Sequence, residues 1–146
     1  MNAFGVTEDV LSADYPVHVA FGGNQHLILG IASRAELAGL AYDFSALREH
    51  MATEGWTTVH AFWPETSSRF HVRNFFPPGG VVEDPATGAA AAAFGGYLRA
   101  LHRISSPSRL ELLQGFDMGS PSRLLVDVTP ADPRVKVTGV ASVISG

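Results

Sequence analysis

The fold of this chain is decided by the stretch Glu83-Asp84-Pro85-Ala86-Thr87-Gly88-Ala89-Ala90-Ala91-Ala92-Ala93-Phe94-Gly95-Gly96-Tyr97-Leu98. Two carboxylates open it, and no charge follows from Pro85 to Leu98. Alanine is the best helix former, and Asp followed by Pro is typical of a helix start. The stretch predicts a helix with Asp84 as N-cap and Pro85 at its first position. Because this helix has no polar face, we expect it to be buried on all sides. It is too short to span a membrane, which takes roughly 20 apolar residues.

Composition limits the remaining possibilities. With 146 residues, 46% of them hydrophobic, the chain is expected to fold as one globular domain over residues 1–146. A formal charge of −4 argues against a broad nucleic-acid-binding face. The absence of cysteine excludes thiolate metal sites and a Cys nucleophile, and the six histidines show no metal-ligand spacing, so no metal site is expected. Residues 1–14 lack the features of a signal peptide, which favours a cytoplasmic location.

The rest of the chain reads as strands with two short helices. Ser33 and Glu36 form a capping box at the start of one helix, and Asp43 caps another that stops at Gly55. Seven segments have strand character: 17–21, 26–32, 56–63, 69–76, 109–114, 123–129 and 135–144. Short links favour antiparallel pairing. The prediction is an α+β fold, a mostly antiparallel curled sheet (a half-barrel) wrapped around one buried central helix.

Residues beside the helix resemble a known family. These residues resemble the signature of the PhzF-like isomerases, which are phenazine-biosynthesis-type proteins related in fold to diaminopimelate epimerase. The residues that carry the resemblance are Arg73, Phe75, Pro77, Gly80, Glu83-Asp84-Pro85-Ala86-Thr87-Gly88 and Ala90. Residues 23–28 resemble the family's Gly-x-x-His-Leu strand. Gln114-Gly115, Met118-Gly119 and Pro121-Ser122-Arg123 resemble a later segment of the family.

The resemblance covers only the second of the family's two lobes. Family members place the active site between the lobes, and their first lobe supplies a catalytic Glu and His. The resemblance implies acid–base proton transfer on a small carboxylate-bearing metabolite without metal or cofactor, active only if a dimer mate or a separate first-lobe chain completes the site. Two residues depart from the pattern: Ala89 stands where the family usually has Ser, and Ser120 where it usually has Arg.

Candidate site residues follow from this stretch. By resemblance Asp84 lines the cleft and holds or shuttles a proton; its other interpretation is a helix cap. Glu83 is a second catalytic candidate, or else a partner for Arg73 or a solvated carboxylate. Thr87, Gly88 and Ala89 offer backbone N–H groups to a carboxylate or phosphate, or else only cap the helix and allow tight packing.

Two further residues and the alternatives complete the hypothesis. Gly80 is grouped with the anion-binding residues through the signature and is otherwise a turn glycine, and His26 is expected to be structural. The alternative functions are a non-catalytic module that binds a small anion and an inactive relic that has lost its general-base lobe.

Overall fold

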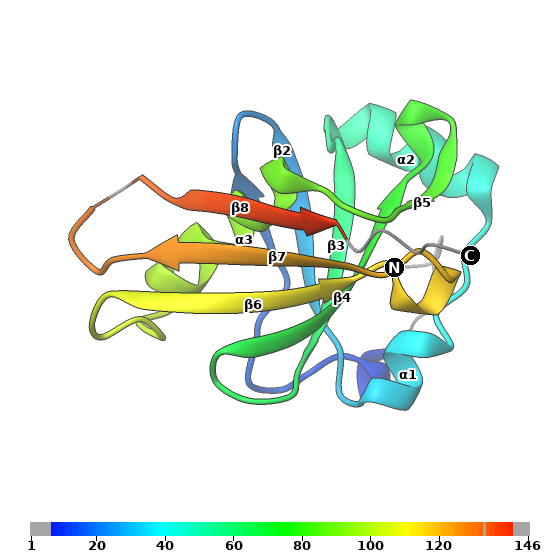
Figure 1. The fold of residues 1–146 in the computed structure, drawn as a ribbon. Coiled ribbons are helices and arrows are strands. Elements are labelled where there is room, and N and C mark those ends of the chain that lie inside the picture. The colour runs from blue at the N-terminus through cyan, green and yellow to red at the C-terminus, as the bar shows by residue number, and fades with distance from the viewer. Residues whose placement is uncertain (1–6, 133, 142–146) are drawn as a thin grey trace.

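The computed structural model describes residues 7–132 and 134–141, which form one curled, mixed sheet with helices on both sides (Figure 1). Its strand order is β1-β2-β3-β4-β6-β7-β8, with β5 paired to β4. Only β2–β3 and β4–β6 are parallel, so the predicted α+β fold with a mostly antiparallel half-barrel sheet is confirmed. The strands are β1 (His18–Phe21), β2 (Gln25–Gly30), β3 (Thr58–Pro64), β4 (Arg69–Phe76), β5 (Val81–Asp84), β6 (Ser108–Gln114), β7 (Ser122–Val128) and β8 (Lys136–Ala141).

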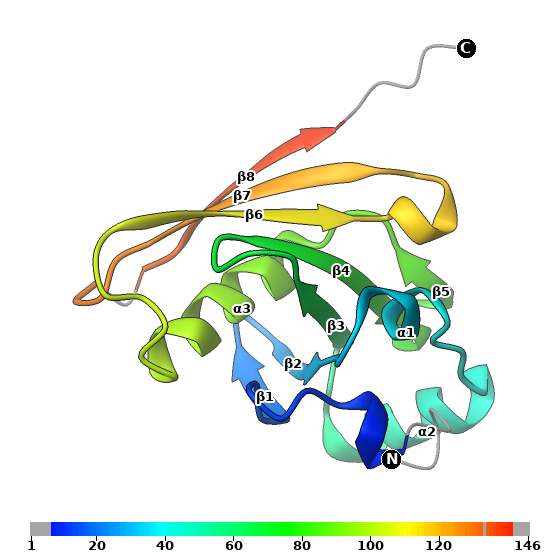
Figure 2. The same cartoon turned by 90° about the horizontal axis from the view of Figure 1, so that it is seen from below.

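Helices lie on opposite sides of this sheet. The helices are α1 (Arg34–Ala38), α2 (Phe44–Glu54) and α3 (Gly88–Ala100), with 3₁₀ turns η2 (Glu8–Val10), η3 (Pro77–Gly79) and η4 (Phe116–Met118). Figure 2 shows α3 between β1 and β2 on one side and β6, β7 and β8 on the other. None of the helices in the described ranges is long and apolar enough to cross a membrane.

Two apolar cores result from this arrangement. The inner core packs Phe94 and Leu98 of α3 against inward-facing residues of the sheet such as Phe62. The outer core packs α1 and α2 against the other face, with Leu37 and Met51 among its buried residues. Strands β2 and β3 therefore read as nearly continuous apolar runs, because both of their faces are covered.

The short helices begin and end as the sequence predicts. The Ser33 hydroxyl accepts a hydrogen bond from the Glu36 N–H at 3.1 Å, as a capping box requires. The Asp43 carboxylate accepts from the Ala46 N–H at 2.9 Å. Gly55 ends α2 at φ 77°, a left-handed conformation that favours glycine.

The predicted start of the long helix is wrong. Helix α3 begins at Gly88 with Thr87 as N-cap, because Glu83 and Asp84 belong to β5 and pair with Phe75 and Asn74 of β4. The Asp84 carboxylate instead accepts from the Ala86 N–H at 3.1 Å and from the Thr87 hydroxyl at 2.9 Å. Asp84 therefore caps a tight turn between strand and helix.

Burial of α3 on all sides is also wrong. Its first two residues, Gly88 and Ala89, are exposed, as is Ala100 at its other end, while Ala92 and Gly96 are half-buried. The uncharged middle of the helix is buried as predicted, from Ala90 to Leu98 apart from these two positions. The predicted final strand reached residue 144, and its last three residues lie outside the described part of the chain.

Candidate functional site at the start of helix α3

One end of the half-barrel is lined with buried polar side chains. Inward-facing positions along β4 and β6 change from apolar to polar toward the strand ends, from Val72 to Asn74 and from Leu112 to Gln114. Strands β4 and β6 end at the edge where β2, β3 and β7 begin, so their polar residues gather there. This polar end comprises His26, Thr58, His60, Asn74, Gln114 and Ser122, all less than 9% exposed.

The Thr87 hydroxyl stands at the centre of the contacts there. It accepts hydrogen bonds from Asn74 Nδ2 at 2.8 Å and Gln114 Nε2 at 3.1 Å, and donates to Asp84 Oδ2 at 2.9 Å. Gln114 Nε2 also donates to the Asp84 carbonyl at 2.8 Å. Because these three partners use the hydrogen-bonding capacity of the hydroxyl, Thr87 holds the loop in place rather than offering its side chain to a ligand.

Two loops meet beside the Thr87 hydroxyl: the β5–α3 loop, residues 85–87, and the β6–β7 loop, residues 115–121. The Ser122 hydroxyl donates to the Pro85 carbonyl across them. Gly115 has φ 82°, and a Cβ there would lie 2.1 Å from the Ser120 carbonyl oxygen and 3.1 Å from that of Pro85. No other residue fits, so the close approach of the two loops depends on this glycine.

The first turn of α3 opens to solvent between these loops. Thr87 makes no side-chain cap, so the first N–H groups of the helix are left for other partners. Gly88 and Ala89 are exposed, and nothing lies within 4 Å of a Cβ built on Gly88. The β1–β2 turn forms a further wall, because a Cβ on Gly22 would lie 2.5 Å from the Ala89 carbonyl oxygen. Uncapped N–H groups at the positive end of a helix suit an anion.

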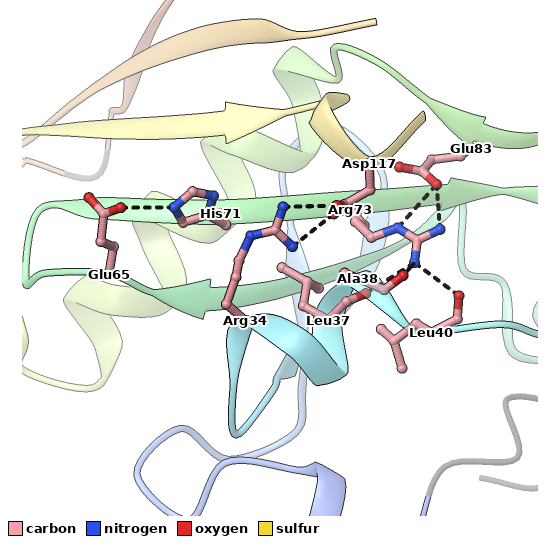
Figure 3. Close-up of polar contacts among 9 residues, drawn as sticks. All are labelled: Arg34, Leu37, Ala38, Leu40, Glu65, His71, Arg73, Glu83 and Asp117. Carbon is pink, nitrogen blue, oxygen red and sulfur yellow. Dashed lines mark hydrogen bonds and ion pairs between the residues drawn. The ribbon is translucent and has the colours of Figure 1, made fainter. Parts of the chain in front are cut away.

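The two neighbouring carboxylates face opposite sides of the sheet. Asp84 is half-buried at the polar end, opposite Asn74. Glu83 is 5% exposed and forms an ion pair with Arg73 at 2.8 Å on the outer side, next to α1 (Figure 3). The pairing of Glu83 with Arg73 is confirmed. The two carboxylates do not form a proton-sharing pair, and the catalytic role of Glu83 stays a prediction.

Gly80 lies away from this group as well. It follows η3 at φ 78° and precedes β5, so the length of a four-residue strand, roughly 13 Å, separates it from Asp84. The structure therefore brings together Asp84, Thr87, Gly88 and Ala89 of the predicted site.

Sequence reasoning missed Asn74, Gln114 and Ser122 as site residues. The available signal was a polar residue near the end or start of three strands whose inward-facing residues are mostly apolar. Asn74 Oδ1 and Gln114 Oε1 have no hydrogen-bond partner within the described residues, which leaves acceptors unused beside the helix start.

Two buried histidines complete the polar end. His26 Nδ1 lies 2.7 Å from Thr58 Oγ1, and burial lowers the pKa of His26, in agreement with a structural role. Burial, and to a smaller extent the neighbouring His26, lowers the pKa of His60 to about 3. Both are therefore neutral at pH 7. Across residues 7–132 and 134–141, no group of three His, Asp or Glu side chains could hold a metal ion.

The fold is a curled sheet with a helix start flanked by an Asp and a Thr-Gly pair, and this combination defines a class of protein. Comparison with known proteins identifies the family. The family described as phenazine biosynthesis-like protein (PhzC-PhzF) matches residues 2–146, and the chain belongs to this family. The trans-2,3-dihydro-3-hydroxyanthranilate isomerase of Pseudomonas aeruginosa is 32% identical over 129 residues, 87% of this chain and 44% of the relative. An uncharacterised isomerase of Deinococcus radiodurans is 31% identical over 94% of this chain and 46% of the relative.

Solved structures agree with this assignment. The PhzF-family phenazine biosynthesis protein of Bacillus anthracis superposes with a TM-score of 0.78 at 18% identity, over 96% of this chain and 51% of that one. A predicted epimerase from Pseudomonas aeruginosa gives 0.75 at 26% identity, over 99% of this chain and 51% of that one. The chain thus spans about half the length of the relatives it matches.

Proposed function

We propose that this chain contributes half of an isomerase active site, which binds the carboxylate of a small metabolite at the start of α3 and moves a proton with Asp84. The observation that carries the proposal is the exposed first turn, Gly88 and Ala89, next to a half-buried Asp84 at the end of β5, which Thr87 holds through a hydrogen bond. The first N–H groups of the helix would hold the carboxylate, and Asp84 would face the adjacent atoms. The substrate named for the Pseudomonas aeruginosa relative carries a carboxylate, which fits this chemistry.

A second lobe would complete the site. Large apolar residues are exposed on the segments around the start of α3: Phe21 before the β1–β2 turn, Val81 and Val82 on β5, and Phe116 and Met118 in the β6–β7 loop. Large apolar side chains exposed on neighbouring segments are typical of contact surfaces. A dimer mate or a first-lobe chain covering them would shield the bound substrate from water and supply the second acid–base group.

A non-catalytic anion-binding module is the second candidate. Ala89 brings no hydroxyl to the first turn, while its backbone N–H remains. This combination would keep an anion site and weaken catalysis.

Binding by the chain alone is tested by NMR. Titration of the ¹⁵N-labelled protein with anthranilate should shift the amide signals of Gly88 and Ala89 in a saturable manner, and inorganic phosphate should compete. Anthranilamide, which has the same ring but no charge, is the matched control and should leave both signals in place. Unmoved Gly88 and Ala89 signals at millimolar anthranilate would refute the anion site.

Catalysis is tested by adding a first lobe. The chain mixed with the separately produced first lobe of the Pseudomonas aeruginosa relative should exchange a substrate proton for deuterium in D₂O. Asp84→Asn should abolish this exchange while the circular dichroism spectrum stays unchanged. Binding of anthranilate without any exchange in the mixture would select the non-catalytic module.

A further inference from the structure

We propose that α1 is a brace that fixes the spacing of the two loops beside the start of α3, with Arg34 and Arg73 as positioning residues. The proposal rests on the proposed function, because these loops flank the same site. Its basis is a chain of contacts that leaves the site through the β6–β7 loop, crosses α1 and returns through β5 (Figure 3).

The first contact joins α1 to the β6–β7 loop. Arg34, the first residue of α1, donates from Nη1 to Asp117 Oδ2 at 3.0 Å and from Nη2 to Asp117 Oδ1 at 2.8 Å. Asp117 is the middle residue of η4, inside the loop. The guanidinium therefore binds the carboxylate in a bidentate geometry, which fixes the orientation of the two groups as well as their distance.

The second contact joins the other end of α1 to β5. Arg73 Nη1 donates to the carbonyls of Leu37, Ala38 and Leu40 at 3.0, 3.1 and 2.9 Å, so it caps the end of α1. Its Nη2 and Nε donate to Glu83 Oε1 at 2.8 and 3.2 Å. With 12% of its side chain exposed, Arg73 lies largely buried between helix and strand and is bonded to both.

Together with direct contacts between the two loops, these contacts form a closed ring beside the site. Glu83 directly precedes Asp84. The position of Arg73 therefore fixes Glu83, and through one peptide unit it also fixes the start of the β5–α3 loop. The two loops meet again where the Ser122 hydroxyl and Gln114 Nε2 hold the carbonyls of Pro85 and Asp84. A five-residue helix is too short to be stable alone. Because both of its ends are held by arginines, α1 sets the distance between the loops.

The test compares two arginines in matched ion pairs. Arg34→Gln breaks the brace, whereas Arg109→Gln breaks a similar two-pronged pair with Asp127 at 2.8 and 3.3 Å between β6 and β7. The readout is the ¹⁵N order parameter at Ala86 and at Ser120, one residue in each loop. In Arg34→Gln both should fall from about 0.85 toward about 0.6, and in Arg109→Gln neither should change. A fall at Ser120 alone shows a purely local ion pair and overturns the proposal, as does no fall at either.

Two further measurements connect the brace to binding. The double variant Arg34→Asp/Asp117→Arg restores a reversed pair and should restore both order parameters. The dissociation constant of anthranilate should rise about threefold to tenfold in Arg34→Gln and return in the double variant. An unchanged affinity despite mobile loops would remove the positioning role. If the wild-type protein does not bind anthranilate, the proposed function fails, and the order parameters alone decide whether α1 is a brace.

Discussion

At the scale of single residues, the Thr87 hydroxyl is the atom on which the site loop depends. It takes up one N–H from each of two buried amides, Asn74 and Gln114, and gives its own proton to Asp84. Thr87→Val keeps the shape and removes all three contacts. Leaving buried donors without an acceptor should lower the free energy of unfolding by about 2 kcal/mol, measured by urea denaturation.

Thr53→Val is the matched control for this change. The Thr53 hydroxyl donates to the Glu49 carbonyl on the exposed surface of α2, where water can replace it. Its effect should stay within about 0.5 kcal/mol. Equal losses in the two variants would contradict the role assigned to Thr87.

His60 predicts a pH dependence of stability. Its pKa is about 3 in the folded protein, because burial disfavours the charged ring, and about 6.5 in an unfolded chain. As the pH falls below 6.5, the unfolded chain takes up a proton that the folded protein does not. The free energy of unfolding should therefore fall by about 2 kcal/mol between pH 7 and pH 5, and the loss should end near pH 3.

His60→Phe tests the origin of this loss. Phenylalanine can pack against Phe94, whose ring centroid lies 4.8 Å from that of His60, and it does not titrate. Urea unfolding at several pH values should show a weaker pH dependence in this variant, with the remainder coming partly from His26, whose pKa is also lowered. The exposed His50→Gln is the control and should keep the wild-type dependence. A wild-type slope in His60→Phe would refute the assignment.

At the scale of elements, the helix start shows where prediction from sequence ends. Asp84-Pro85 matches a helix N-terminus, and the high alanine content correctly predicts the helix itself. What the sequence does not reveal is that Glu83 and Asp84 pair with β4, an interaction with residues about ten positions away. These two residues end the strand, the next three form the turn, and the helix begins only at Gly88.

The glycine pair in α3 supports a prediction on packing. A Cβ on Gly95 would lie 3.0 Å from methyl groups of Val126, Val128 and Val135, whereas on Gly96 it would meet only an Arg99 nitrogen at 3.8 Å. Gly95→Ala should lower the free energy of unfolding by about 1 kcal/mol, because three branched side chains must move together. Gly96→Ala should raise it by about 0.5–1 kcal/mol through helix propensity. Thermal unfolding of both variants distinguishes the positions, and stabilisation by Gly95→Ala would contradict the packing argument.

At the scale of the whole molecule, the sequence predicts the half-barrel better than it predicts the site. Strand segments are visible because alternation and turn residues are local signals. The polar end depends on where strands from different parts of the chain begin and end, so Asn74 and Gln114 become site residues only in three dimensions. Likewise, nothing local to Arg73 indicates that α1 will cover it on the outer face.

The exposed apolar residues around the start of α3 predict association of the whole molecule. If a second copy of the chain covers this surface, sedimentation velocity at about 100 µM should show a dimer, and Phe116→Lys should shift it to monomer by placing a charge in the contact. Val17→Lys is the matched control, since Val17 is 43% exposed near the opposite end of α3, where the Pro16 carbonyl accepts from the Tyr97 hydroxyl. A monomer at this concentration would exclude self-pairing and leave a separate first-lobe chain as the partner. A dimer that Val17→Lys breaks and Phe116→Lys does not would place the contact away from the site, so that pairing could not complete it.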